Sequence, residues 1–256
     1  MNRAIYPILS GALAQERSLQ VFAHNIANVN TAGFKQDHQG FRAIMAKRVP
    51  GPVGIPGVQS IAHHIMAAPG GPASRVYAAP HFSRTTFEAG RTRITSNPLD
   101  VAIQGDGFFE VKTPQGVRYT RNGMFSLDNQ RRLITNTGFP VMGTKGEIKV
   151  PAGVLHISGV GEIQVDGKAV GTIKVMQFPE NEMPTKSDDG LFVGSKGTVM
   201  AHPTLQPGHI EESNVNSLGE MVKMIQGMRT YESAQKMIQT IDRMAEVAIQ
   251  DVGRVL

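Results

Sequence analysis

The chain has 256 residues, 40% of them hydrophobic and 18% charged, which is the composition of a globular rather than a disordered protein. It contains no Cys, which excludes disulfides and thiolate metal sites, and no apolar run reaches the roughly 18 residues of a membrane span. The net charge of +5 arises before residue 90; because these basic residues are scattered, we interpret them as a solvated surface and expect no nucleic-acid binding.

The first predicted element is an amphipathic helix over about residues 3–28, because apolar side chains recur there three and four positions apart. The residues expected to contact another helix or subunit from this segment are Ile5, Leu9, Ala12, Leu19, Ala23, Ile26, Asn28 and Asn30. Glu16 is the one residue that interrupts the apolar seam. Asn28 and Asn30 disfavour a helix interior and end the helix, and Gly33 can adopt a positive φ.

The same residues imitate a secretory signal peptide. Arg3 precedes a weakly apolar run, and Ala12-Leu13-Ala14 resembles a cleavage site. The run is short and contains Pro7, and cleavage after Ala14 would remove half of the predicted helix. We therefore expect the segment to be retained.

Residues 23–35 read AHNIANVNTAGFK. This segment resembles the N-terminal signature of the bacterial flagellar axial family, which comprises the rod and hook subunits. The match runs without gaps, with His24 where Asn is common and Ala32 where Thr or another small residue is usual.

Residues 36–89 are expected to form a linker. Its centre, residues 49–74, is rich in Gly and Pro, which prevents a long helix and favours extended or partly disordered chain before assembly. His63-His64 is a weak metal candidate, because adjacent side chains point apart and no carboxylate is near in sequence.

Residues 90–212 have the short period of strands and tight turns, which predicts a mostly antiparallel β domain. Asn122-Gly123 and Asp166-Gly167 are both predicted to form type I′ hairpin turns. Strands are expected at 99–103, 108–111, 117–120, 124–127, 133–135, 147–150, 154–157, 162–165, 168–170, 172–178, 191–193 and 198–200.

Residues 95–109 and 119–125 also resemble the core block of the axial family, with a departure at residues 130–132, where the family usually has a Gly. Gly105-Asp106-Gly107 is no phosphate loop, because strand-like residues and not a helix follow it. Residues 190–198 likewise lack phosphate-loop spacing. We expect no enzymatic activity, no catalytic residue, no cofactor and no metal.

A second long helix is predicted from about residue 217, where Ser217 and Glu220 form a capping box. Its apolar stripe supplies the other residues expected at a subunit interface: Leu218, Met221, Ile225, Met228, Tyr231, Ile238 and Ile241. With the preceding residues 208–216, it resembles the C-terminal signature of the axial family. Three blocks in the family's order reach both ends of the chain.

The predicted fold class is α+β. The terminal segments 1–35 and 213–256 pair as a coiled coil, residues 36–89 link them to the body, and residues 90–212 form the β domain. Two long amphipathic helices leave apolar flanks uncovered when they pair, and a heterologous contact that does not close propagates into a filament.

The resemblance implies a structural subunit of the flagellar basal-body rod, which self-assembles or co-assembles through its terminal helices and transmits torque. It further implies export by the flagellar apparatus without a cleaved signal, rod or hook subunits as partners, and a location spanning the periplasm. The first residues and the tail from Gln226 resemble proximal-rod subunits more than distal-rod or hook subunits. The alternative from another class is a signal-bearing periplasmic β protein that binds glycan. Contact of residues 36–89 with peptidoglycan or anionic lipid is a weaker hypothesis.

Overall fold

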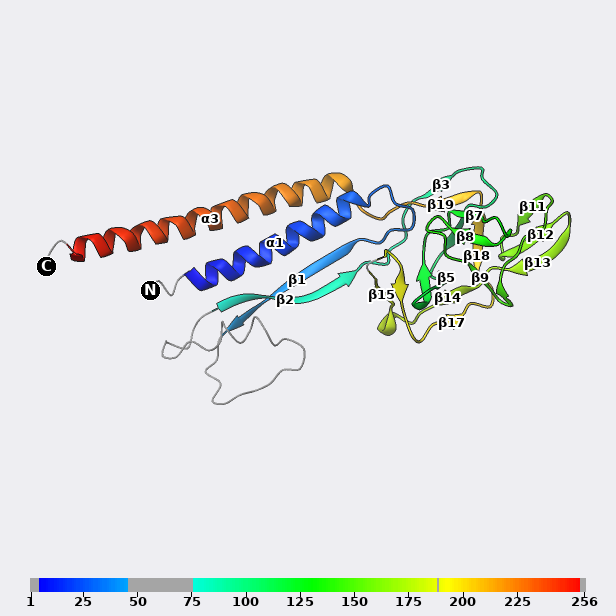
Figure 1. Ribbon diagram of the computed structural model, residues 1–256, viewed down its shortest axis with the longest axis horizontal. Helices are drawn as coiled ribbons and strands as arrows, with labels where there is room; N and C mark the ends of the chain where they lie inside the picture. Colours follow the sequence, from blue (N-terminus) through cyan, green and yellow to red (C-terminus); the bar gives the residue numbers. More distant parts are fainter. Residues whose placement is uncertain (1–4, 46–75, 188, 254–256) are drawn as a thin grey trace. The chain divides into compact units, whose positions relative to one another are not determined.

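Figure 1 shows the computed structural model, which describes residues 5–45, 76–187 and 189–253. The chain divides into two compact units. The helical unit takes residues 1–26, 37–84 and 217–256, and the β unit takes residues 27–36 and 85–216. Residues 27–35, expected with the terminal helices, thus belong to the β unit, because residues 33–36 bond to groups of that unit.

In the helical unit, α1 (Ile5–Ala27) and α3 (Ser217–Gly253) occupy the places predicted for the two terminal helices. The unit also contains two strands that the sequence did not predict, β1 (Asp37–Met45) and β2 (Val76–Thr85). They pair in a two-stranded sheet and run in opposite directions (Figure 1). The Gly/Pro-rich residues 49–74, with His63-His64, lie outside the described residues.

The two helices run antiparallel. Asn25, near the end of α1, bonds to Glu220 in the first turn of α3. Gly227, two turns further along α3, lies against Gln15 and Leu19, which are earlier in α1. A methyl group on Gly227 would lie 2.7 Å from the Gln15 amide nitrogen and 2.9 Å from a Leu19 methyl carbon. The glycine that weakens α3 in isolation therefore permits a close approach of α1.

All the described strand pairs of the β unit are antiparallel, as predicted. Its largest sheet has six strands in the order β15 (Thr185–Lys186), β16 (Phe192–Val193), β6 (Gly116–Thr120), β5 (Phe108–Thr113), β14 (Val175–Gln177) and β17 (Thr198–Val199). A three-stranded sheet joins β11 (Leu155–Ile157), β12 (Glu162–Val165) and β13 (Lys168–Thr172).

Four two-stranded ladders complete the unit. The pairs are β3 (Thr92–Ile94) with β19 (His209–Glu211), β4 (Val101–Gln104) with β18 (Thr204–Pro207), β7 (Phe125–Leu127) with β8 (Leu133–Thr135), and β9 (Met142–Gly143) with β10 (Gly146–Glu147). A single turn of 3-10 helix, η1, covers Glu180–Glu182. Neither β18 nor β19 was among the predicted strands, although both lie within the predicted β domain. They pair residues beyond position 200 with β4 and β3, which lie near the start of the unit.

The core of the β unit consists of two clusters. The larger contains completely buried aliphatic and aromatic residues, among them Phe109, Leu133 and Ile163. The smaller is aromatic, and Phe108 lies at its centre, with its ring edge-to-face against Phe178 and Phe192 at 5.7 and 5.4 Å between centroids. Edge-to-face contacts of this kind stabilise a core beyond the area that they bury.

The predicted turn at Asn122-Gly123 is wrong. Neither residue has a positive φ, and β6 and β7 pair with other strands rather than with each other. Gly123 instead lies where a β-carbon would come within 1.7 Å of the Val101 carbonyl oxygen, and its own carbonyl accepts a hydrogen bond from the Val101 amide. The glycine is required for close backbone approach, a need that the dipeptide pattern cannot distinguish from a hairpin turn.

The predicted turn at Asp166-Gly167 is confirmed. Both residues have positive φ, 50° and 77°, and they connect β12 to β13. At residues 130–132, where the family's Gly is missing, Arg131 itself adopts φ 61°. Its guanidinium donates to the carbonyls of Val150 and Pro151, which compensates the cost of a left-handed conformation in a side-chain-bearing residue.

Candidate assembly surface

The exposed faces of the two helices are the candidate functional site. On α3, the positions that are buried or half-buried alternate four and three apart, beginning at Glu220, Met224 and Gly227 and continuing through Tyr231, Ala234, Ile238, Ile241 and Ala245. This spacing is that of one helix face packed on a neighbour. On α1, one stripe with this spacing consists of the half-buried or buried residues Ile5, Ile8, Ala12, Gln15, Leu19, Phe22 and Ile26, and a second consists of Pro7, Ser10, Ala14, Ser18, Val21 and Asn25.

A second apolar stripe on α3 is exposed. We call it the α3 patch, and it consists of Leu218, Met221, Val222, Ile225 and Met228. Leu218 is 71% exposed and Ile225 53% exposed. Leu218, Met221, Ile225 and Met228 had been predicted to lie in the stripe that contacts α1, but the face toward α1 lies one position earlier along the helix.

A corresponding stripe on α1, the α1 patch, consists of Tyr6, Leu9 and Leu13. Leu9 was predicted at an interface; Tyr6 and Leu13 were not, because the predicted seam followed a single stripe. Contiguous exposed apolar side chains on a soluble protein mark a surface that binds another molecule. None of the described helices is both long enough and apolar enough to cross a membrane.

The remaining predicted interface residues divide between buried and exposed positions. Ala12 is buried, Ile5, Leu19, Ile26, Tyr231, Ile238 and Ile241 are half-buried, and Ala23 is exposed. Asn28 accepts hydrogen bonds from Thr31 through both its side chain and its backbone carbonyl, whereas Asn30 is exposed. These two asparagines lie in the β unit, and their part in assembly stays a prediction.

One asparagine joins three segments of the helical unit. The side chain of Asn25 is buried; its amide donates to Glu220 at 3.0 Å and to the carbonyl of Asp37 at 2.9 Å. Its oxygen accepts from the amide of Asp37 at 3.0 Å. Glu220 also accepts from Lys223 at 2.7 Å. Asn25 therefore holds the start of β1 and the first turn of α3 against the end of α1.

The β unit contains a buried charged cluster that the sequence did not predict. Glu211, on β19, accepts from Lys35 at 2.6 Å, from Arg121 at 2.7 Å and from the amide of Gly90 at 2.9 Å. Lys35 also donates to the carbonyl of Glu88, and the guanidinium of Arg121 donates to the carbonyls of Gly105 and Gly107. The segments that meet here are separated in sequence, and no local pattern links them.

Charge compensation in this cluster shifts two pKa values. Burial by itself would raise the pKa of Glu211, but the neighbouring Arg121 and Lys35 outweigh it and hold that pKa below its usual value of 4.5. Burial lowers the pKa of Lys35 below 10.5, and Glu211 offsets only part of that effect. Removing the carboxylate would leave two buried cations without compensation.

Further contacts seat residues 33–36 in the β unit. Lys186 places its ammonium 3.6 Å from the centre of the Phe34 ring and donates to the carbonyl of Lys35. Gly33 has φ 69°, as its type allows, and a β-carbon there would lie 2.4 Å from the backbone of Arg121. Asn214 accepts from the amide of Gln36 and donates to the carbonyls of Thr86 and Glu88.

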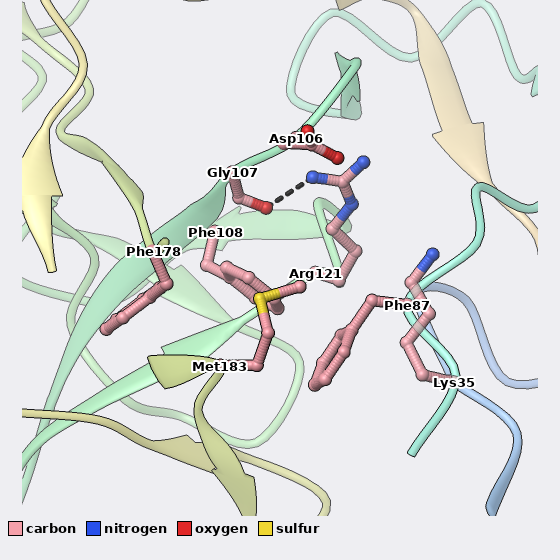
Figure 2. Close-up of a pocket in the computed structure, with 8 residues that line it drawn as sticks. All are labelled: Lys35, Phe87, Asp106, Gly107, Phe108, Arg121, Phe178 and Met183. Carbon is pink, nitrogen blue, oxygen red and sulfur yellow. Dashed lines mark hydrogen bonds between the residues drawn. The ribbon is translucent and has the colours of Figure 1, made fainter. Parts of the chain in front are cut away.

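A small hollow borders the charged cluster. Figure 2 shows Phe87, Phe108 and Met183 around it, with Lys35 and Arg121 at its edge. It offers about 10 Å³, the space of about one water molecule. It is too small for an organic ligand. Among the described residues, no group of three His, Asp or Glu side chains could hold a metal ion.

Comparison with known proteins places the chain among flagellar proteins. The family model described as "Flagella basal body rod protein" matches residues 6–35. The model "Flagellar hook protein FlgE/F/G D1 domain" matches residues 102–174, and "Flagellar basal body rod FlgEFG protein C-terminal" matches residues 206–251. The matched ranges contain nearly all of α1 and of α3 and most of the β unit's core.

Full-length relatives give the same result. The flagellar basal-body rod protein FlgG of Bacillus subtilis is 31% identical, over 96% of this chain and 97% of the relative. FlgG of Caulobacter vibrioides is 30% identical, over 97% and 98%. The flagellar basal-body rod protein FlgF of Escherichia coli is also 30% identical, over 94% and 95%.

Proposed function

The chain belongs to the flagellar basal-body rod protein family, and from this premise we propose that it joins the rod through the exposed apolar faces of α1 and α3. It is a structural subunit of the basal-body rod. The main support for this mode of assembly is the exposure of apolar side chains on both helices. A helix pair whose exposed side includes Tyr6, Leu9 and Ile225 is incompletely shielded from water in a single chain.

The pairing of α1 with α3 is proposed to be a coiled coil. The alternation of four and three between half-buried positions on both helices supports this arrangement, as does the close approach at Gly227. In the assembled rod, torque would pass along these packed helices. The partners would be other axial subunits of the rod or hook, as well as further copies of this chain.

The chain is proposed to reach the periplasm through the flagellar export apparatus without losing its N-terminal residues. Cleavage after Ala14 would remove the buried Ala12 and half of α1, which contacts α3. The intact mass of the protein in isolated basal bodies tests this: a chain that begins at Met1 or Asn2 is expected. A chain that begins at Gln15 would favour a signal-bearing periplasmic protein.

Two finer assignments stay predictions. The proximal-rod subtype rests on the resemblance of the first and last residues, and the relatives include both FlgG and FlgF proteins. Contact of residues 36–89 with peptidoglycan rests on composition. Pelleting with purified sacculi would contradict it if deletion of residues 46–75 left binding unchanged.

Serine substitution of three residues in the α3 patch tests the proposed mode of assembly: Leu218→Ser, Met221→Ser and Ile225→Ser. We expect this variant to be missing from isolated basal bodies and its cells not to swim, because the apolar contact is lost. The matched control replaces three exposed polar residues of α3, with Gln226→Ser, Glu232→Ser and Gln239→Ser, and should assemble normally. If the patch variant were present in isolated basal bodies at the level of the wild-type protein, the proposal would be contradicted.

A further inference from the structure

The β unit contains a body, residues 99–200, that makes most of its contacts among its own residues. Every strand of the six-stranded sheet and of the three-stranded sheet lies in this range. Several pairings join consecutive strands, such as β5 with β6, β7 with β8 and β11 with β12. Of the buried residues in the larger hydrophobic cluster, all except Leu205 lie between Val101 and Leu191. The body therefore carries nearly all of the unit's core.

A second part of the unit, which we call the strap, consists of residues 33–36 and 85–96. Its backbone bonds mainly to a late stretch of the chain, residues 204–214, which we call the closing segment. Strand β3 of the strap pairs with β19 of the closing segment, whose other strand, β18, pairs with β4 of the body. Backbone amides extend the contact, from Gly33 to Glu211, from Glu212 to Arg91, from Asn214 to Phe34 and from Thr95 and Ser96 to Gly208. The closing segment thus joins both parts of the strap to the body.

Two side chains of the closing segment complete this contact. The carboxylate of Glu211 accepts from the ammonium of Lys35 and from the amide of Gly90. The side chain of Asn214 bonds to three backbone groups of the strap, in Gln36, Thr86 and Glu88. Glu211 follows Lys35 by 176 positions, and Asn214 follows Gln36 by 178. The groups that hold residues 33–36 therefore come from the far end of the unit's sequence.

The body contacts the strap at fewer points. Lys186 donates to the carbonyl of Lys35, and its ammonium lies over the ring of Phe34. The ring of Phe87 packs against the smaller hydrophobic cluster. These contacts place aromatic rings on the body, but none of them supplies a negative charge for the ammonium of Lys35.

The buried charge of Lys35 is what makes the closing segment necessary. Lys35 is only 1% exposed, and an ammonium buried without a counter-charge is strongly destabilising. Two charged residues of the body act on the pKa of Lys35, and the repulsion from Arg121 outweighs the attraction of Asp106. Before Glu211 arrives, docking of residues 33–36 would therefore bury one cation beside another. The strap has a favourable site only when the carboxylate is in place.

Chain entropy favours the same order of events. The cost of closing a loop grows with the number of residues in it, and contacts between near neighbours in sequence form more readily than distant ones. The hairpins of the body close short loops, whereas the strap and the closing segment lie at opposite ends of the unit's sequence. Units of this size commonly fold through an intermediate.

We propose that the β unit folds in two steps: the body forms first, and the closing segment then fixes the strap on it, with Glu211 as the group that completes the second step. The consequence for assembly rests on the proposed function. In a chain that leaves the export apparatus from its N-terminus, residues 33–36 emerge first, and residues 215–256, which contain α3, follow the closing segment. The β unit is then complete before α3 pairs with α1.

Pulse-labelling hydrogen exchange during refolding of the full-length chain tests this order. The purified protein is unfolded in urea, diluted and labelled after increasing delays, and nuclear magnetic resonance reads the label at single amides. The body is followed through amides that donate within it, those of Lys112, Leu133 and Ile173. The second step is followed through amides that bond between the strap and the closing segment, those of Gly33, Thr95 and Glu212.

In the wild-type chain, we expect the body amides to be protected first. The amides of the second step should follow together, at a rate at least about tenfold lower, because a longer loop has to close. In Glu211→Gln, the body amides should be protected at the wild-type rate. The remaining amides of the second step should stay at least about tenfold less protected than in the wild type, because two buried cations have lost their carboxylate.

Two further variants make the test specific. Glu212→Gln is the matched control and should refold as the wild type does, because Glu212 pairs with Arg93 outside the buried cluster. Asn214→Ala removes contacts of the strap but no charge, so it should slow the second step alone even if Glu211→Gln never completes folding.

Three results would overturn the proposal: protection of body and strap in a single phase, equal slowing of both in Glu211→Gln, or the same delay in Glu212→Gln. The measurement uses the purified chain alone, so its failure leaves the proposed mode of assembly intact. Conversely, if the variant of the α3 patch assembled normally, the order of folding within the β unit would be unaffected.

Discussion

The β unit buries two clusters of hydrophobic side chains, whereas Ala12 is the only buried hydrophobic residue among the side chains of α1 and α3 that the structure describes. The polar groups differ as well. The β unit neutralises a buried carboxylate with two cations, Lys35 and Arg121, while the helical unit joins its segments mainly through the amide of Asn25. The β unit thus completes its own core, whereas the helices expose the apolar stripes through which we propose that a partner binds.

The largest expected effect on stability is that of Glu211→Gln. This change leaves Lys35 and Arg121 buried with no compensating charge, which typically costs about 3–5 kcal/mol. Urea unfolding followed by near-ultraviolet circular dichroism measures the loss. Glu212→Gln is the matched control, because Glu212 pairs with Arg93 at an exposed site where such a change costs about 0–1 kcal/mol. Equal costs for the two variants would contradict a special role for Glu211.

Acid should weaken the β unit through the same residue. The native pKa of Glu211 is lowered, so its stabilising contribution is complete above its unfolded value of about 4.5. The contribution is lost as the pH falls through the native pKa. Asp128 and Glu147 also have lowered pKa values and remain in Glu211→Gln. The stability difference between wild type and variant therefore isolates Glu211, and it should shrink below pH 4.5; a constant difference down to strong acid would exclude this explanation.

A smaller and differently located effect is expected for Asn25→Ala. The change removes three hydrogen bonds of the Asn25 side chain, two with the partly buried backbone of Asp37 and one with buried Glu220, and losses of this kind cost about 1–3 kcal/mol. Hydrogen exchange should speed up in α1 and the first turn of α3 but not in β5 or β8. Asn30→Ala, at an exposed position, should leave exchange unchanged. Equal acceleration in both units would mean that they do not unfold separately.

The comparison also explains what the sequence could predict. The periodicity of α1 and α3 predicted both helices, and alternating strands with Asp166-Gly167 predicted an antiparallel domain, because these signals are local. Glu211 pairs with Lys35, which precedes it by 176 positions, and with Arg121, which precedes it by 90 positions. Nothing near Glu211 in the sequence indicates which cations it will bind. Its detection required the fold.

The helix faces could be predicted only in part from the sequence. A period of 3.6 residues predicts that an apolar face exists but not which of two adjacent apolar stripes packs inside the chain. On α3 the stripe through Met221 and Ile225 is the more apolar, yet the face through Glu220 and Gly227 lies against α1. A buried acid and a glycine are poor sequence signals for a packed face. Glu220 is accommodated on this face because Asn25 donates a hydrogen bond to it. Gly227 is accommodated because the absence of a side chain lets α1 pack closely.

The smallest expected effect on stability is that of a substitution in the α3 patch. Ile225→Ser should change the free energy of unfolding by no more than about 0.5 kcal/mol, because Ile225 is already exposed in the isolated chain. Ile238→Ser, at a half-buried position, should cost about 1 kcal/mol or more. Sedimentation at rising concentration should reverse this order, with self-association reduced more by Ile225→Ser. Since stability and assembly would then depend on opposite faces of one helix, loss of both properties in the Ile225 variant would mean that this stripe packs within the chain.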